Sequence, residues 1–355
     1  MLRTPLYNAH VMLGAKLVDF AGWEMPVQYA GIIAESKAVR EGAGMFDVSH
    51  MGRVWFKGEG AFEFLQTITS NDVGKLADWG SQYSLMCYEN GTCVDDIIVY
   101  RIADGVFQVV INASNREKDI AWMKSHMSGD VNLDDASDRT AMIAVQGPRA
   151  VEIVNILTDE DITGVEKFSA VKCTVVGHDV LACRTGYTGE DGFELIVESG
   201  FAEPIWDALA AAGVQPCGLA SRDVLRVEAG LPLYGHELSD AINPIETGLG
   251  WVCAKNKSYI GSEAIEAMRA VGPPRKLVGI RMESKIVPRE GYEIRQNGER
   301  IGEVSSGVFS PILDCGIAFA FVDKDHATLD TPCSVVVREN EMPATVVNKR
   351  FMRSS

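Results

Sequence analysis

Apolar and polar positions alternate along the stretch between residues 83 and 112. Its three strand-like segments read "YSLMCYE", "TCVDDIIVYRI" and "VFQVVIN". Asn90-Gly91 and Asp104-Gly105 separate them, and such dipeptides are typical of tight hairpin turns. The pattern therefore predicts a three-stranded antiparallel meander.

The turns predict which residues oppose one another in this meander. A two-residue loop at Asn90-Gly91 places Leu85 opposite Asp96, and a three-residue loop at 103–105 places Asp96 opposite Asn112. Side chains alternate between the two faces of a strand, so Asp95 is expected on the other face. The shared face is expected to carry Tyr83, Leu85, Asp96, Ile98, Tyr100, Val110 and Asn112.

This face mixes aromatic, aliphatic and polar side chains. A plain core face would carry neither Asp nor Asn, and a plain solvent face would carry more Lys, Glu and Thr. Two interpretations follow. Either Asp96 and Asn112 bond only to each other or to nearby backbone, or they form one wall of a pocket for a flat polar ring.

Two later segments also carry polar residues in notable positions. The stretch "GYTGEDG" at 186–192 lacks the spacing of a dinucleotide loop and precedes a strand, so it is expected to form a tight hairpin turn. Glu194 lies within that apolar strand, where a lone Glu usually marks the solvated side. Arg222 and Arg226 share one face of a predicted helix, where Arg222 could belong to a surface ion network.

The break at Gly272-Pro273-Pro274 divides the chain. Before it, strands and helices mix without regular alternation, which is typical of an α+β fold. After it, short alternating segments joined by Asn-Gly and Pro turns predict a small antiparallel barrel or sandwich. A domain border is therefore expected at this point.

Composition narrows the class of protein. The 355 residues are 46% hydrophobic and 23% charged, which is typical of a soluble globular protein of two or three domains. The net charge of −16 argues against nucleic acid as a partner. With no apolar run long enough for a bilayer and no secretory signal, we expect a cytoplasmic protein without membrane contact.

The eight cysteines and the basic C-terminus do not alter the predicted class of protein. No two cysteines form a C-x-x-C pair, which favours reduced thiols over disulfides or a zinc site. Near the C-terminus Lys349, Arg350 and Arg353 cluster around Phe351. This cluster is either a solvated tail or a contact for an anionic ligand or an acidic protein.

Eight motifs along the chain occur together in the order found in one family. They are "TPLYNAHVMLGAKLVDFAGWEMPVQY", "GMFDVSHMG", "VDDIIVY", "AVQGP", "CRTGYTGEDGFEL", "RDVLRVEAGLPLYGHEL", "NPIETGLGW" and "SSGVFSP". Nearly end to end, the chain resembles the folate-dependent family of the aminomethyltransferase, or T-protein, of the glycine cleavage system. Each motif alone is modest, but the ordered set is specific.

The resemblance implies a fold. It is an α+β cloverleaf of three domains around a central folate channel, with a C-terminal antiparallel β-barrel. Residues 1–272 would form two interleaved α+β domains, approximately 1–50 with 139–225 and 51–138 with 226–272, and 273–355 would form the barrel.

The resemblance also implies a reaction that needs no metal. The lipoylated H-protein of the glycine cleavage system would deliver an aminomethyl group on a lipoyl sulfur. Tetrahydrofolate, the co-substrate, would take the methylene carbon. The products would be 5,10-methylenetetrahydrofolate, ammonia and dihydrolipoyl H-protein.

By position in the motifs, the resemblance implies that Asp96 is the catalytic carboxylate. It implies that Glu194 binds the pterin, and a carboxylate can accept both donors of a paired N–H edge. The other binding residues that it implies are Met51, Tyr83, Tyr100, Val110, Asn112, Tyr187 and Arg226. The chain departs from the family at Arg53, where Glu is common, and at Arg350, where Pro is frequent.

Two kinds of relative remain as alternatives. One is a tetrahydrofolate-dependent demethylase, whose members tend to alter the region around Asp96, which is intact here. The other is a non-catalytic folate-binding maintenance factor for iron-sulfur enzymes. Its cysteine-containing motif corresponds to 257–263, which reads "KSYIGSE" without cysteine.

Overall fold

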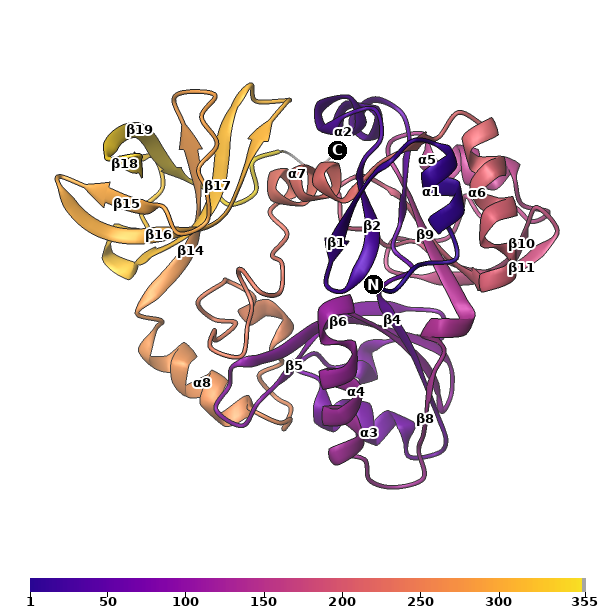
Figure 1. The fold of residues 1–355 in the computed structure, drawn as a ribbon. Coiled ribbons are helices and arrows are strands. Elements are labelled where there is room, and N and C mark those ends of the chain that lie inside the picture. Colours follow the sequence, from indigo (N-terminus) through magenta and orange to yellow (C-terminus); the bar gives the residue numbers. More distant parts are fainter. Residues whose placement is uncertain (353–355) are drawn as a thin grey trace. The chain divides into compact units, whose positions relative to one another are not determined.

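The computed structural model describes residues 1–352, which fall into two compact units. The first unit comprises residues 1–86 and 95–222, and the second comprises 87–94 and the chain from residue 223 onward. Figure 1 follows the chain through both units. Among the described residues, no helix has both the length and the apolar character needed to cross a membrane.

A six-stranded sheet forms the larger core of the first unit. Its strand order is β10-β11-β12-β9-β3-β13, and every pairing is antiparallel except β13 with β3. The strands are β3 (Gly44–Asp47), β9 (Thr140–Gln146), β10 (Ala170–Val175), β11 (His178–Cys183), β12 (Gly192–Glu198) and β13 (Gln215–Pro216). Trp206 and Leu209, from one helix, are fully buried in the same core cluster as Phe193 and Leu195 of β12.

A five-stranded sheet forms the second part of this unit, in the order β5-β6-β7-β4-β8. The strands are β4 (Gly52–Lys57), β5 (Ser81–Cys87), β6 (Cys93–Ala103), β7 (Val106–Ile111) and β8 (Asn132–Asp135). A separate antiparallel pair consists of β1 (Lys16–Phe20) and β2 (Trp23–Gln28). The helices are α1 (Tyr7–Met12), α2 (Ile32–Glu41), α3 (Ala61–Ile68), α4 (Arg116–Ser125), α5 (Ala150–Ile156) and α6 (Ala202–Ala211).

A closed barrel forms the second unit's core, drawn orange to yellow in Figure 1. Its strands are β14 (Arg275–Met282), β15 (Glu293–Gln296), β16 (Glu299–Ser310), β17 (Cys315–Asp323), β18 (Thr331–Val337) and β19 (Asn340–Val347). Every pairing between them is antiparallel. The α+β class and the C-terminal antiparallel barrel that the sequence predicts are confirmed.

Two longer helices and several short ones complete the described chain. α7 (Leu219–Ala229) ends at Gly230, and α8 (Ser262–Val271) ends at Gly272, where the sequence predicts a break. Both glycines have positive φ, as is common just after a helix. Short 3-10 helices lie at Val73–Lys75, Ala113–Asn115, Ser137–Arg139, Ser199–Phe201, Gly250–Val252 and Lys324–His326.

The two hairpin turns of the meander differ from their predictions. Tyr88 N–H donates to the Thr92 carbonyl and Gly91 N–H to the Tyr88 carbonyl, so the first loop has three residues, 89–91, and not two. Gly91 has φ +79°, the left-handed conformation that this type of loop requires. The predicted two-residue loop is therefore wrong.

The second turn is shorter than predicted, but the register after it is correct. Ala103 pairs directly with Val106, and a bulge at Ile102 takes up the extra residue. Ile98 consequently pairs with Val110, as the sequence predicts. This register brings the start of β6 beside the residue that follows β7.

The compact units divide residues 226–272 differently from the implied domains. The resemblance groups this segment with 51–138, whereas in the structure it is compact with the barrel and with the short piece 87–94. The buried cluster shared by Val224 and Val227 of α7 with Phe319 of β17 shows how the segment joins the barrel.

We expect Gly192→Ala to destabilise the fold at the start of β12. A Cβ at this position would lie 2.0 Å from the Val145 carbonyl oxygen on the neighbouring strand. Backbone cannot yield as a flexible side chain can, so the free energy of unfolding should fall by roughly 2–3 kcal/mol in urea titrations. Gly200→Ala is the control, since its Cβ would meet nothing within 4 Å. Equal stability of the two variants would contradict this account.

Candidate functional site

The start of β6 carries a bonded group of polar side chains. Asn112 Nδ2 donates to Asp96 Oδ1 at 2.8 Å and to Asp95 Oδ1 at 2.9 Å. The Tyr83 hydroxyl donates to Asp96 Oδ2 at 3.0 Å. Both oxygens of the Asp96 carboxylate are thus oriented by neighbours that the sequence places on its face.

Asp95 and Asp96 differ in burial, as strand alternation predicts. Asp95 is fully buried and Asp96 is partly exposed. Asp95 also accepts from Asn112 N–H at 3.0 Å and from Asn115 Nδ2 at 2.6 Å. The Asn112 amide therefore connects a carboxylate inside the unit with one at its open side.

The electrostatic surroundings make Asp96 an unusual acid. Burial, and next the negative charge of Asp95, raise the pKa of the Asp96 carboxyl to about 7, against the lowering effect of the bonds from Tyr83 and Asn112. Near neutral pH both protonation states are accessible. Such a group can accept or release a proton during a reaction.

A second carboxylate lies further along the same unit. Glu194 on β12 is 7% exposed, so the expectation that it marks a solvated side is wrong. Thr185 Oγ1 donates to Glu194 Oε2 at 2.6 Å and is bonded to the Tyr100 hydroxyl at 2.8 Å. Burial raises the pKa of Glu194, and the nearby Arg222 charge opposes the rise.

β6 connects these two polar groups. Asp96 and Tyr100 are four residues apart and point to the same face, a spacing of about 13 Å along a strand. The Tyr100 hydroxyl leads through Thr185 to Glu194. One face of β6 therefore carries Asp96 at one end and, through Tyr100 and Thr185, contacts Glu194 at the other.

Arg222 is a member of the second group that the sequence interpretation missed. Its guanidinium lies over the Tyr187 ring, 4.9 Å from the centroid, and 5.9 Å from that of Phe46. Its Nη1 is buried without a hydrogen-bond partner among the described residues. The surface ion network proposed for Arg222 is wrong. Its place on a predicted helix face, one turn before Arg226, was the available signal.

Arg226 belongs to the second unit. It is 2% exposed and donates to Glu237 at 2.9 Å, to Asp223 at 2.8 Å and to the Ser306 hydroxyl at 2.7 Å. These partners account for the guanidinium within its own unit. Its implied role in binding pterin stays a prediction.

The remaining implied residues lie on or beside β4 and β7. Val110 is buried and pairs with Ile98 and with Arg53 across the sheet. Met51 is partly exposed, and its carbonyl accepts from Arg53. The fully buried Arg53 also donates to the carbonyls of three further residues, Ser49, Ser137 and Thr140. Arg53 thereby fixes the segment that carries Met51.

The glycine-rich segment before β12 is a longer loop than predicted. It runs from residue 184 to 191 between β11 and β12, so the expected tight turn is wrong. Arg184 forms two bonds with Asp191 at 3.1 and 2.9 Å, and Arg40 pairs with Glu190 at 2.8 Å. These ion pairs hold the loop that contains Tyr187.

The basic C-terminus is only partly a solvated tail. Lys349 is half-buried and donates to the Thr247 carbonyl, whereas Arg350 is exposed. Arg353 lies outside the described residues. The contact of this basic cluster with an anionic ligand or an acidic protein stays a prediction.

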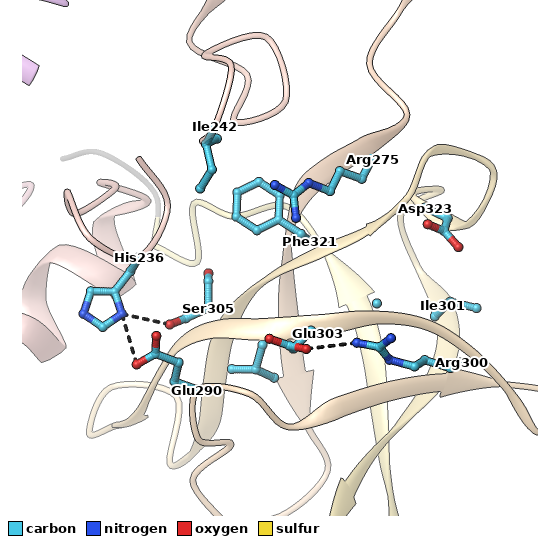
Figure 2. A pocket seen from close by; sticks show the side chains of 12 residues that line it. His236, Ile242, Arg275, Glu290, Arg300, Ile301, Glu303, Ser305, Phe321 and Asp323 are labelled. Carbon is cyan, nitrogen blue, oxygen red and sulfur yellow. Dashed lines mark hydrogen bonds and ion pairs between the residues drawn. The ribbon is translucent and has the colours of Figure 1, made fainter. Parts of the chain in front are cut away.

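A pocket of about 380 Å³ on the second unit is a weaker candidate site. Figure 2 shows that its charged groups face one another: Arg300 pairs with Glu303 at 2.9 Å, and His236 lies 3.4 Å from Glu290. Arg275 lies over the Phe321 ring and pairs with Glu246. Within residues 1–352, no three His, Cys, Asp or Glu side chains are placed to hold a metal ion.

Comparison with known proteins covers nearly the whole chain. A family model described as the GCVT N-terminal domain matches residues 6–257, and one described as the glycine cleavage T-protein C-terminal barrel domain matches residues 275–352. The chain is 46% identical to an aminomethyltransferase of Geobacillus kaustophilus, covering 99% of this chain and 98% of that one. It is 43% identical to an aminomethyltransferase of Bacillus subtilis, covering 99% of each.

A solved structure is similar over the same length. The crystal structure of the glycine cleavage system aminomethyltransferase T from Bartonella henselae has a TM-score of 0.94 and 31% identity to this chain. The match covers 99% of this chain and 98% of the other.

We expect Asp96→Asn to stabilise the protein more at pH 8.5 than at pH 5.5. The folded-state pKa of Asp96 lies above its unfolded value, so its contribution to stability is present at low pH and is lost as pH rises toward about 7. Removing the charge should raise the free energy of unfolding at pH 8.5 by roughly 1–3 kcal/mol. Urea titrations at both pH values measure it. Asp104→Asn, at a fully exposed side chain, is the control.

Proposed function

Because the chain belongs to the family of glycine cleavage system aminomethyltransferases, we propose that the β6 face between Asp96 and Tyr100 holds tetrahydrofolate during aminomethyl transfer. The observation that carries this proposal is a pair of carboxylates at the two ends of this face. Asp96 is held in one orientation and has a pKa of about 7, and Glu194 is buried near the Arg222 cation. The chain is an aminomethyltransferase of this system.

The donor in the proposed reaction is an aminomethyl group on a lipoyl sulfur of the H-protein. The carbon–sulfur bond breaks with its electrons on sulfur, which ends as a thiol, and N5 of tetrahydrofolate bonds to the carbon. Ammonia then leaves and N10 closes the ring, giving 5,10-methylenetetrahydrofolate. The carbon carries positive charge while its bonds change.

Asp96 is suited to this chemistry by its position and its pKa. Tyr83 and Asn112 hold its carboxylate in one orientation without further rearrangement. A preorganised negative charge stabilises a developing cation. A carboxyl with a pKa near 7 can also take the proton that N5 loses and give a proton to the amine that leaves as ammonia.

Glu194 and Arg222 are suited to recognition of the pterin ring. The ring presents two donors, the 2-amino group and N3–H, beside an acceptor, the C4 carbonyl oxygen. Glu194 can accept from both donors, and the unpartnered Arg222 Nη1 can donate to the acceptor. Tyr187, under the Arg222 guanidinium, supplies an aromatic wall.

The two alternative functions are not favoured by the comparisons. Relatives along the whole chain are named aminomethyltransferases, and both family models describe the glycine cleavage protein. The assay that tests the proposal mixes the protein with tetrahydrofolate and aminomethyl-loaded H-protein, and measures ammonia together with methylenetetrahydrofolate. Folate binding without either product would refute the transfer. The cytoplasmic location stays a prediction.

We expect substitutions at the two carboxylates to separate binding from turnover. Asp96→Asn keeps the shape but removes the charge, so turnover at saturating tetrahydrofolate should fall about 100-fold or more while folate still binds. Glu194→Gln places a donor against a donor and should weaken folate affinity by roughly 1–3 kcal/mol. Folate titration and timed ammonia release measure these effects. Near-normal turnover of Asp96→Asn would leave Asp96 as a pocket-shaping residue.

We expect Arg222→Met to weaken tetrahydrofolate binding by about 1–3 kcal/mol, the usual contribution of a hydrogen bond from a charged group. Its stability should fall by less than that of Arg226→Met, because the Nη1 atom has no hydrogen bond to lose and only the Tyr187 ring contact and the charge near Glu194 are removed. Arg226→Met is the matched variant one turn along α7. It leaves Glu237 buried without its cation, so it should lower stability by roughly 3–5 kcal/mol. Unchanged folate affinity in Arg222→Met would exclude it from the site.

A further inference from the structure

The buried face of α4 continues the polar group behind β6. Asn115, Asp119 and Met123 are each four residues apart along the chain and are all buried. Residues at this spacing lie above one another on one side of a helix. Asn115 bonds to Asp95, and Asp119, one turn further along the same helix face, lies beside Asp95 as well.

Asp119 is the one group in this arrangement whose bonding is incomplete. It is 0% exposed, and neither of its carboxyl oxygens accepts a hydrogen bond from an N–H or hydroxyl group of the described residues. The charged groups facing it are Asp95 and Asp96 from β6 and Lys118 of its own helix. Burial, then the negative charge of Asp95 and a side-chain hydrogen bond with it, raise the pKa of Asp119 to about 11, and the charge of Lys118 opposes the rise.

Asp95, in contrast, accepts three hydrogen bonds from N–H groups. They come from Asn112 N, Asn112 Nδ2 and Asn115 Nδ2. N–H groups can only donate, so these three bonds use Asp95 as an acceptor. Two carboxyls this close cannot both be ionised without a large cost, so one proton between them belongs on Asp119.

We propose that Asp119 is a positioning residue: an uncharged, buried carboxylic acid that donates to Asp95 and so keeps Asn112 directed at Asp96. The proposal rests on the proposed role of Asp96. The bond from Asp119 adds a fourth donor to Asp95. The bonds that Asp95 accepts from Asn112 hold the Asn112 side-chain amide in place. With that amide fixed, its second N–H reaches Asp96 Oδ1.

This arrangement also fixes the number of negative charges behind Asp96. A neutral Asp119 leaves Asp95 as the single charge whose repulsion acts on Asp96 from inside the unit. An ionised Asp119 would add a second. The acidic limb of the pH profile for turnover therefore reports the charge of Asp119 through Asp96.

The first test measures the proton itself and does not depend on activity. At pH 9, infrared difference spectra between wild type and Asp119→Asn should show loss of one C=O band of a protonated carboxylic acid. Glu117→Gln, an exposed acid in the same helix turn, should leave that band in place. Absence of the band from the Asp119→Asn difference spectrum would overturn the proposal.

The second test measures positioning. Asp119→Asn, a neutral donor of the same shape, should keep turnover within a few-fold and leave the acidic limb of its pH profile in place. Asp119→Leu cannot donate, and should lower turnover about 10- to 100-fold, the scale of a small misplacement, with tetrahydrofolate affinity unchanged. Equal turnover in the two variants, or an acidic limb moved to lower pH in Asp119→Asn, would overturn the proposal.

The two tests also separate this proposal from the proposed function. If wild type releases no ammonia with aminomethyl-loaded H-protein, the function fails while the infrared result still decides the protonation of Asp119. If Asp119→Leu does not fold, Asp119→Asn and its spectrum remain decisive.

Discussion

The hydrogen bonds of one amide, Asn112, organise the candidate site. Its side-chain N–H groups reach a buried carboxylate on one side and a partly exposed carboxylate on the other. With the amide turned around, its oxygen would face the oxygens of both carboxylates, and no hydrogen bond would form while both are ionised. In the observed orientation one side chain donates to both acids and holds them in a single geometry.

Much of this arrangement could be predicted from residue order, although for partly mistaken reasons. Both hairpin loops differ in length from the loops that the sequence predicts. A bulge at Ile102 nevertheless leaves Ile98 paired with Val110, as predicted. Bulges respond to local twist and leave no reliable mark in a single sequence. Because Ile98 pairs with Val110 as predicted, Asp96 and Asn112 lie side by side although the predicted turn length is wrong.

What could not be predicted depended on contacts between distant segments. Glu194 looked like a solvated residue because only its own strand was visible, while its burial results from strands on both sides and from Thr185. Arg222 and Arg226 looked equivalent on one helix face. Their surroundings differ because α7 passes from one compact unit into the other between them. A spacing of four residues predicts that two side chains share a helix face, but not which other segments they contact.

Arg53 has a consequence for how this chain could change over generations. Its guanidinium donates only to neutral oxygens, four carbonyls and the Thr140 hydroxyl, and so ties β4 of one sheet to the start of β9 in the other. The Glu that the resemblance implies at this position would face the same carbonyls with no proton to offer. A Glu at residue 53 would therefore need different partners around it. One buried guanidinium therefore links the two sheets, and the groups around it are suited to a hydrogen-bond donor.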